Sequence, residues 1–239
     1  MNIVDLAGLG LFVIAFFGYA HIANFAGRGK NVNALMHEVR RVWMQRLMER
    51  PDRIVDASLT GHTVNSMSFF SSATILVVAG LLGVLGQAEE AQKVMAGWVF
   101  VAHSSATLFQ LKIIGLVAIF VYGFFRFTWA LRQYNYCCTL IGAAPLAKND
   151  YPHRIELADQ MARIYTSALT SFGGGIRCYY FALAWLAWLI DPVAFVVATI
   201  GVMLVLLRRQ VASNSAHAIR RYVELNPPEG PPSPGPSEN

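Results

Sequence analysis

A long apolar block interrupted by an aspartate–proline pair constrains this chain more than any other feature. Residues 176–207 are almost wholly apolar, and Asp191 and Pro192 lie near their middle. As one helix the block would run on the order of 45 Å, whereas a bilayer core is only about 30 Å thick. Proline lacks the N–H that a helix interior needs, and it moves the preceding residue out of the helical conformation. The block therefore predicts two spanning helices joined by a tight turn.

The composition favours a membrane protein throughout. The chain has 239 residues, of which 55% are hydrophobic and 14% are charged, whereas a soluble domain usually carries about 25% charged residues. The apolar residues gather in blocks long enough to cross a bilayer. These blocks predict five spans, at residues 3–25, 66–86, 108–131, 170–190 and 192–208. The expected fold class is all-α, an integral membrane helical bundle.

Two more segments show helical periodicity with polar residues between the apolar ones. Residues 31–56 predict an amphipathic helix, broken near Pro51, on the cytoplasmic membrane surface or against the cytoplasmic ends of the bundle. Its basic side is expected to face anionic headgroups or solvent. Residues 152–171 predict a second amphipathic helix that runs on into the fourth span. Residues 132–145 are interpreted as a loop, residues 87–97 as a short polar link, and residues 98–107 as an interfacial segment.

The basic residues predict the orientation. The formal net charge is +5, and most Lys and Arg residues lie in the loops and tail that five spans place on one side. By the positive-inside rule, the N-terminus lies outside and the C-terminus is cytoplasmic in the cell membrane. The expected partners are the lipid bilayer and its anionic headgroups, not nucleic acid, because no groove-reading motif is present. The small-residue second span and aromatic fourth span are compatible with a homo-oligomer or a membrane-protein partner.

The last residues differ in composition from the rest. Residues 223–239 are rich in Pro, Ser, Gly and Glu, and such a segment cannot bury a core. The sequence therefore predicts a membrane-embedded domain over residues 1–222 and a disordered cytoplasmic tail after it.

Several stretches together resemble the DUF599 family of multi-pass membrane proteins. They are RRVWMQRLMERPDRIVDASL followed by FFSSATILVVAGLLGVLG, then FTWALRQYNYCCTLIGAAP and RCYYFALAWLAWLIDP. The resemblance covers roughly residues 30 to 210. It implies a membrane location and family membership, and it implies no catalytic or binding residue.

Arg177 is the leading candidate for a functional contact, because ionisable groups inside a membrane are costly. It follows Gly173, Gly174 and Gly175, which are expected to bend or loosen the helix. A guanidinium beside exposed backbone N–H groups could hold an anion or a lipid phosphate. The alternative is that Arg177 extends to the headgroups or pairs with an acidic residue of a cytoplasmic helix.

Lys112 and His21 are weaker candidates. Lys112 lies near the outer end of the third span, where it could extend to the headgroups or line an entrance. His21 and His62 both lie near the cytoplasmic boundary, but no third ligand is aligned with them to form a haem or metal site. No hydrolase, metalloprotease, P-loop or CxxC motif is present. We therefore expect no catalytic residue, cofactor or metal.

Three functions remain open after these observations. The first is a non-enzymatic scaffold, or a membrane component that binds lipid or a partner. The alternative is an oligomeric channel or transporter for a small ion, with Arg177 contacting an anion. The third, a membrane enzyme or redox protein, has only scattered histidines and cysteines to support it.

Overall fold

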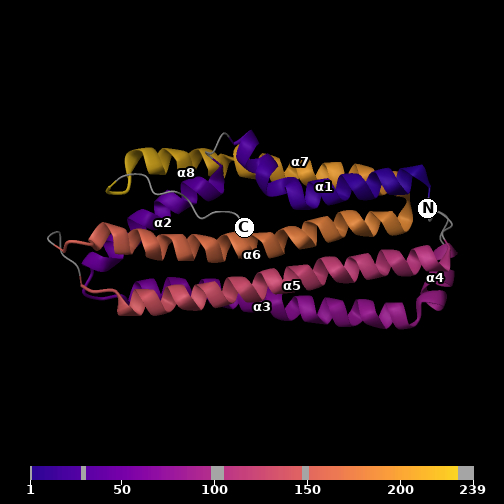
Figure 1. Cartoon of the computed structure of the whole chain (residues 1–239), viewed down its shortest axis with the longest axis horizontal. Helices are drawn as coiled ribbons and strands as arrows, with labels where there is room; N and C mark the ends of the chain where they lie inside the picture. Colours follow the sequence, from indigo (N-terminus) through magenta and orange to yellow (C-terminus); the bar gives the residue numbers. More distant parts are fainter. Residues whose placement is uncertain (1, 28–30, 98–104, 147–150, 231–239) are drawn as a thin grey trace. The chain divides into compact units, whose positions relative to one another are not determined.

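The computed structural model describes residues 2–27, 31–97, 105–146 and 151–230. Within these ranges the regular elements are all helices (Figure 1). In chain order they are α1 (Ile3–Ala26), α2 (Val32–Glu49), α3 (Ile54–Gly86), α4 (Ala88–Ala96), α5 (Ala106–Ala143), α6 (Arg154–Ile190), α7 (Pro192–Val211) and α8 (Asn214–Leu225). The predicted all-α fold class is confirmed.

The chain divides into two compact units that share its long helices. Unit 1 consists of Met1–Ile22, Phe70–Arg126 and Gly174–Leu206. Unit 2 consists of Ala23–Phe69, Phe127–Gly173 and Leu207–Asn239. Most of α1 and α7 therefore belongs to unit 1, α2 and α8 belong to unit 2, and α3, α5 and α6 contribute to both.

Four helical segments of the described chain are long and apolar enough to cross a membrane. They are Ile3–Ala26, Ile54–Gly86, Ala106–Ala143 and Pro192–Leu225, the last of which joins α7 and α8. They contain four of the five predicted spans. The remaining span, at residues 170–190, lies within α6, where Arg177, glycines and aromatic residues with polar atoms lower the mean hydropathy. A fifth crossing therefore stays a prediction.

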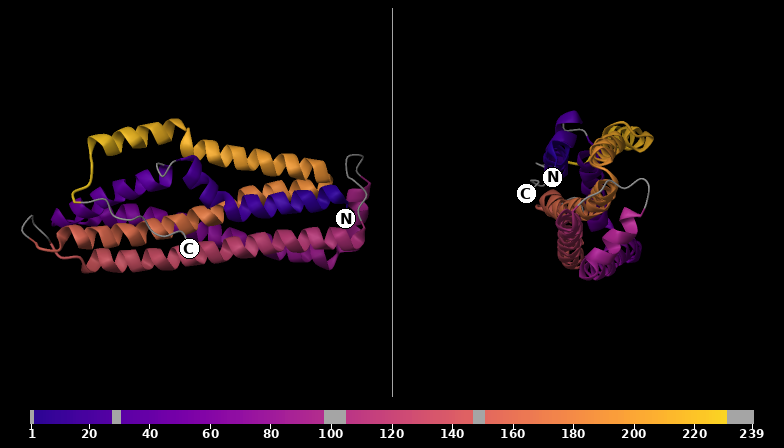
Figure 2. Two further views of the ribbon diagram at one scale, coloured as in Figure 1. Left: turned by 45° about the horizontal axis from the view of Figure 1, so that its top comes forward. Right: turned by 90° about the vertical axis from the view of Figure 1, so that its right-hand side faces the viewer.

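The turn predicted at Asp191 and Pro192 is confirmed. Helix α6 ends at Ile190, and α7 begins at Pro192 and returns alongside α6 (Figure 2). The Asp191 carboxylate accepts hydrogen bonds from the backbone N–H groups of Val193 (2.7 Å) and Ala194 (3.1 Å). An aspartate at the N-cap followed by proline at the first helical position is a favourable way to start a helix.

The structure corrects one local prediction and refines another. The expected loop at residues 132–145 is wrong, because α5 continues to Ala143. Tyr134, Cys137 and Ile141 are buried at helical spacing, so packing keeps this segment helical. At the glycine triplet α6 continues as helix without interruption, and the expected bend or loosening there stays a prediction. The polar link at residues 87–97 contains a short helix, α4. The interfacial segment at residues 98–107 lies largely outside the described residues.

Unit 2 has a hydrophobic core to which α2 contributes directly. Met44, Leu47 and Met48 of α2 are fully buried there, together with Tyr134 of α5 and Met161 of α6. Helix α2 begins at an Asn31 cap, whose side chain accepts a hydrogen bond from the Ala34 N–H. It ends at Glu49, two residues before Pro51. Helix α8 continues to Leu225, three residues into the segment predicted as a tail, and residues 231–239 lie outside the described chain.

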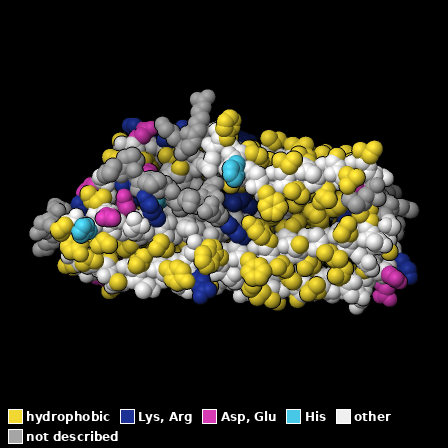
Figure 3. Space-filling view, in the orientation of Figure 1, with side chains coloured by type: hydrophobic (Ala, Val, Ile, Leu, Met, Phe, Trp, Pro, Cys, Tyr) yellow, Lys and Arg dark blue, Asp and Glu magenta, His cyan; other side chains and the backbone are white. Residues whose placement is uncertain are grey.

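Unit 1 has an aromatic core. Phe12 of α1 packs against Phe181 and Trp185 of α6 and Phe195 of α7, with ring centres 4.9 to 5.6 Å apart. Trp188 stacks on Phe195 at 5.0 Å. Hydrophobic side chains also cover the visible surface along α5 and α7 (Figure 3). Buried aromatic contacts and an apolar exterior are what a helical unit needs when its solvent is lipid.

Candidate functional site

Two oppositely charged side chains of unit 1 are buried on either side of Trp188. Asp5 of α1 is 3% exposed and Lys112 of α5 is 4% exposed. The Trp188 indole N–H donates a 2.7 Å hydrogen bond to the Asp5 carboxylate. The Lys112 ammonium donates a 2.5 Å hydrogen bond to the Trp188 carbonyl and lies 5.2 Å from the centre of its ring. One tryptophan therefore contacts both charges, with its indole and its backbone.

The chain sequence explains why Lys112 binds at this carbonyl. In a continuous helix the Trp188 carbonyl would accept the N–H of residue 192, but that residue is a proline and has none. The free carbonyl lies at the C-terminal end of α6, where the helix dipole favours a cation. The Asp5 carboxylate lies in the first turn of α1, where the dipole favours an anion, and also accepts the Asn2 N–H at 2.7 Å.

Lys112 is held from a second direction as well. The Trp185 indole N–H donates a 2.7 Å hydrogen bond to the Lys112 carbonyl. Its ring packs on Gly115, where a Cβ would lie only 2.1 Å from a ring carbon. The sequence suggested that the Lys112 side chain extends outward to the headgroups, but in the structure it is buried and bonds to the Trp188 carbonyl. Its role as an ion contact remains a prediction. These contacts could not be predicted from the sequence, because they join residues that lie far apart in the chain. The residues are Asp5, Lys112, Trp185 and Trp188.

Arg177 of α6 lies on an aromatic ring of α1. Its guanidinium carbon is 5.0 Å from the centre of the Tyr19 ring, a distance typical of a cation–π contact. The Tyr19 hydroxyl donates a 3.3 Å hydrogen bond to the Leu206 carbonyl of α7, which fixes the ring. Arg177 itself is half-buried. Arg177 therefore combines a contact between two helices of unit 1 with a side chain that is partly accessible.

One of the glycines before Arg177, Gly174, makes room for a second arginine. A Cβ on Gly174 would lie 2.6 Å from Nε of Arg126 and 2.7 Å from one of its terminal nitrogens. A Cβ on Gly123 would lie 3.1 Å from the Cys178 Cβ, so α5 and α6 approach closely here. Gly173 has open space around it. Arg126, which was not among the residues singled out from the sequence, joins the candidate residues.

Two basic residues of α2, Arg40 and Arg41, are buried within unit 2. Arg41 is 1% exposed and pairs with Asp159 of α6 through two hydrogen bonds of 2.8 and 3.0 Å, and with Glu38 at 2.9 Å. Burial lowers the pKa of Arg41, but the hydrogen bonds to the two carboxylates outweigh it and raise that pKa overall. The expectation that this side of α2 faces headgroups or solvent is therefore wrong at Arg41.

Arg40 and His37 share one hydroxyl of α6. Arg40, 8% exposed, donates a 3.2 Å hydrogen bond to Thr166 and lies 5.8 Å from the Tyr165 ring centre. Burial lowers the pKa of Arg40 to about 10, so it remains a cation at neutral pH. Nδ1 of His37 lies 3.0 Å from the same hydroxyl, and burial lowers the pKa of His37. His37 is therefore neutral at pH 7 beside a permanent cation.

Further polar contacts join the helices of unit 2 to the segment after α8. Arg154 of α6 pairs with Glu49 of α2 at 2.6 Å and also with Glu229. The Gln45 amide makes hydrogen bonds to the backbone of Glu229 in both directions, at 2.9 and 3.0 Å. Arg53 donates hydrogen bonds to backbone carbonyls at and after the end of α5, those of Ile141, Ala144 and Pro145. Charged and polar side chains therefore connect α2, the end of α5, α6 and the segment after α8 within unit 2.

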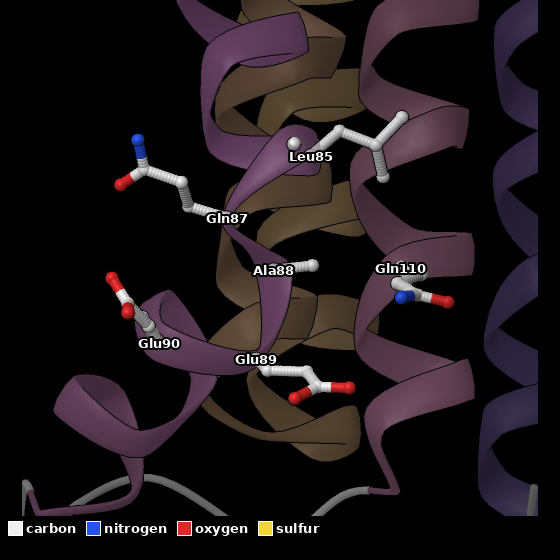
Figure 4. A pocket seen from close by; sticks show the side chains of 7 residues that line it. Leu85, Gln87, Ala88, Glu89, Glu90 and Gln110 are labelled. Atoms are coloured by element: carbon white, nitrogen blue, oxygen red, sulfur yellow. The ribbon is translucent and has the colours of Figure 1, made fainter.

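A pocket of unit 1 lies where α3 turns into α4, with a volume of about 550 Å³. Its lining residues are Leu85, Gly86, Gln87, Ala88, Glu89, Glu90 and Gln110. Glu89 extends toward the α5 side, where Gln110 lies, whereas Gln87 and Glu90 point away (Figure 4). Lys112 is not in this lining, since two residues along a helix place it on another side from Gln110.

The histidines and cysteines do not come together in the described ranges. His21 is exposed, and His103 lies outside the described residues. No group of three His, Cys, Asp or Glu side chains that could hold a metal occurs among the described residues. Cys137 and Cys178 are buried thiols, and Cys138 is half-buried.

The comparisons with known proteins give one match. The model of a family described as "Protein of unknown function, DUF599" matches residues 7–215. No curated protein matches the chain, and neither does any solved structure. The match covers most of α1 through the start of α8, and so includes both units. The chain therefore belongs to the DUF599 family, as the four quoted stretches suggested.

Proposed function

We propose that this protein is a non-enzymatic membrane component that serves as a scaffold, holding lipid or a partner protein on a rigid helical framework. The observation that carries the proposal is the polar network of unit 2. Arg41, Arg53 and Arg154 connect α2, α5, α6 and the segment after α8 through charge-assisted hydrogen bonds. Charge-assisted bonds are stronger than neutral ones and restrict geometry. A framework held by such bonds keeps its surface in one conformation, which suits the binding of lipid or of a partner protein.

In this proposal the chain crosses the bilayer five times, with the N-terminus outside and the C-terminus in the cytoplasm. The apolar window of α3 supports a lipid-facing role for that helix, because only 6% of it is buried within the described chain. Gly80 and Gly83 of α3 have open space where a Cβ would be. Small residues of this kind allow a neighbouring helix to come close, which supports the predicted homo-oligomer or membrane-protein partner.

A second candidate function is an oligomeric channel or transporter for a small ion. The buried Asp5 and Lys112 favour it, because ionisable groups in apolar helices often mark ion pathways. The predicted anion contact at Arg177 belongs to this candidate.

Ion flux in proteoliposomes separates the two functions. The scaffold proposal predicts that vesicles containing the wild-type chain are no leakier to chloride, potassium or protons than empty vesicles. The transporter proposal predicts flux that falls in the variants Arg177→Ala or Lys112→Met. Flux in the wild type that both variants abolish would contradict the scaffold proposal. Absence of flux in all three preparations would remove the transporter.

A further inference from the structure

The segment that follows α8 docks on the surface of unit 2. It runs from Asn226, the C-cap of that helix, through two prolines to Glu229 and Gly230. Pro227, Glu229 and Gly230 remain exposed, although side chains of α2 and α6 contact the segment. A segment bound on the surface in this way can be released and replaced without opening the hydrophobic core.

The Gln45 side chain of α2 binds the backbone of this segment. Its amide nitrogen donates a 2.9 Å hydrogen bond to the Glu229 carbonyl, and its amide oxygen accepts a 3.0 Å hydrogen bond from the Glu229 N–H. Two residues that face each other in an antiparallel sheet exchange the same kind of bond pair. Gln45 is only 3% exposed, so these bonds are partly shielded from water. Backbone bonds of this kind give a peptide affinity, whereas side-chain contacts give it selectivity.

Arg154 of α6 recognises the Glu229 side chain. One terminal nitrogen of its guanidinium donates a hydrogen bond to the Glu229 carboxylate. The other terminal nitrogen donates a 2.6 Å hydrogen bond to Glu49 of α2, which holds the guanidinium in position. Arg154 is 6% exposed, and charge-assisted bonds are stronger than neutral ones. A residue without a carboxylate at position 229 would lose this contact.

Gly230 occupies a position where a side chain does not fit. Its φ of 83° is a left-handed backbone conformation that residues with a Cβ rarely adopt. A Cβ there would also lie 2.9 Å from Cγ2 of Ile155 in α6, closer than van der Waals contact allows. The docked segment is therefore selected at two consecutive positions, by a carboxylate at Glu229 and by the absence of a side chain at Gly230.

The residues before Glu229 favour an extended approach to these contacts. Arg46 of α2 donates a 2.7 Å hydrogen bond to the Asn226 side chain, which holds the start of the segment. Pro227 and Pro228 have no N–H that would need a partner, and their rings fix φ near the extended region. The segment therefore loses less conformational freedom on docking than a chain without prolines would.

We propose that Gln45, Arg154 and Ile155 form a docking site for an extended peptide in which glutamate precedes glycine, and that the chain's own residues 226–230 occupy it. The inference rests on the scaffold function proposed above and names the kind of protein segment that the scaffold holds. A tethered segment is present at an effective concentration on the order of millimolar. The chain's own segment therefore competes with any peptide from solution, and the site becomes available when that segment is displaced.

The first part of the test uses hydrogen exchange of the full chain in detergent to follow the chain's own segment. The Glu229 N–H, which bonds to Gln45, should be protected in the wild type. Gly230→Ala should speed its exchange at least about tenfold, because the Cβ disfavours the docked backbone and approaches Ile155. Gly201→Ala in α7 adds the same methyl group where there is open space and should leave the exchange unchanged.

The second part measures the binding of a fluorescent peptide of residues 225–230, with uncharged ends, by its anisotropy. The Gly230→Ala chain should bind this peptide at least about tenfold more tightly than the wild type, whose own segment competes for the site. Adding Gln45→Ala or Arg154→Gln to Gly230→Ala should weaken binding at least about tenfold. Adding Arg221→Gln, at an exposed arginine of α8, should leave binding unchanged.

Changes in the peptide test the same contacts from the other partner. A peptide with Glu229→Gln or with Gly230→Ala should bind the Gly230→Ala chain at least about tenfold more weakly than the natural sequence, because each change removes one basis of selection. These peptides keep the test decisive even if Arg154→Gln, which also loses its pair with Glu49, does not fold. Helical content by circular dichroism identifies the variants that are folded.

Several results would overturn the docking site. They are retained protection of the Glu229 N–H in Gly230→Ala, equal binding of the natural peptide to the wild type and to Gly230→Ala, and equal binding of the natural and substituted peptides. Absence of peptide binding to every chain would overturn it as well. Each of these results is independent of the flux measurement. Ion flux would contradict the scaffold function, whereas failure of the peptide to bind would remove the site and leave the scaffold proposal standing.

Discussion

The Trp188 indole N–H donates its hydrogen bond to the buried carboxylate of Asp5, 183 residues away in the chain, at 2.7 Å. Replacing Trp188 with Phe keeps much of the ring packing but removes this donor. A buried acceptor without its partner costs about 1–3 kcal/mol, and more when it is charged. We therefore expect Trp188→Phe to lower the melting temperature in detergent clearly. Trp129→Phe, at a half-exposed ring of α5, should change it little. Equal melting temperatures for wild type and Trp188→Phe would contradict the structural role of this bond.

Gly115 should tolerate no side chain. A Cβ there would lie 2.1 Å from a ring carbon of Trp185, whose indole is fixed by its hydrogen bond to Lys112. Overpacking of this kind typically costs about 1–3 kcal/mol. Gly115→Ala should lower the melting temperature, whereas Gly142→Ala in the same helix, with open space around it, should leave it equal or raise it. The opposite order of the two variants would show that α5 and α6 do not approach at Gly115.

The Arg41 and Asp159 pair should be one of the stronger contacts of unit 2. Its two hydrogen bonds of 2.8 and 3.0 Å join α2 and α6, and Arg41 is shielded from water. Removing one partner of a buried pair costs about 3–5 kcal/mol, because the other charge stays buried. Arg41→Gln should therefore destabilise the protein severely. Arg221→Gln, which breaks the exposed pair with Glu224, should cost less than about 1 kcal/mol.

A double-mutant cycle checks that the cost of Arg41→Gln comes from the pair itself. Asp159→Asn in the Arg41→Gln background should cost less than Asp159→Asn alone, since the partner charge is already gone. Additive costs measured by thermal unfolding would contradict a direct interaction between Arg41 and Asp159.

His37 should make stability depend on pH. Its ordinary pKa is 6.5, and burial, with Arg40 and Arg41 nearby, lowers the pKa in the folded protein despite Glu38 and Asp159. Between the two pKa values the unfolded chain binds more protons than the folded one. Stability is therefore full above pH 6.5 and decreases as the pH falls from 6.5 toward the folded pKa.

The measurement compares melting temperatures at pH 8 and pH 5.5 for the wild type and for His37→Gln. Glutamine keeps a hydrogen-bonding group near the Thr166 hydroxyl but does not titrate in this range. The decrease on acidification should be smaller in His37→Gln than in the wild type, and unchanged in His217→Gln, at an exposed histidine of α8. A decrease of the same size in wild type and His37→Gln would exclude His37 as its source.

Hydrophobic patterning was enough to predict the long apolar helices and one of their turns. The apolar runs at residues 3–25 and 192–208 nearly coincide with α1 and α7, because long apolar helices are specified locally by composition. The Asp191 cap and Pro192 were also predictable, since an N-cap acts within three residues. Local signals were therefore sufficient for the long apolar helices and for the chain reversal at Asp191 and Pro192.

The candidate site depended on contacts that no local pattern encodes. The polar side of α2 suggested solvent or headgroups, but Asp159 and Thr166 lie more than a hundred residues further along the chain and bury it. The glycine triplet suggested a bend because glycine weakens a helix. One role that the structure gives to Gly174, room for the Arg126 guanidinium, could be predicted only by knowing that α5 packs there. Lys112 likewise turns inward because Pro192 leaves the Trp188 carbonyl available.

Thiol labelling shows on which side of the membrane each segment lies, and so decides whether the chain crosses the bilayer five times. In a cysteine-free background, single variants Glu90→Cys in α4 and His217→Cys in α8 are treated in intact cells with a thiol reagent that does not cross membranes. Five crossings with the N-terminus outside predict that Glu90→Cys is labelled in intact cells and His217→Cys only after permeabilisation. Labelling of both variants in intact cells would mean that α6 does not cross, and labelling of His217→Cys alone would mean that the orientation is reversed; either result would contradict five crossings with the N-terminus outside.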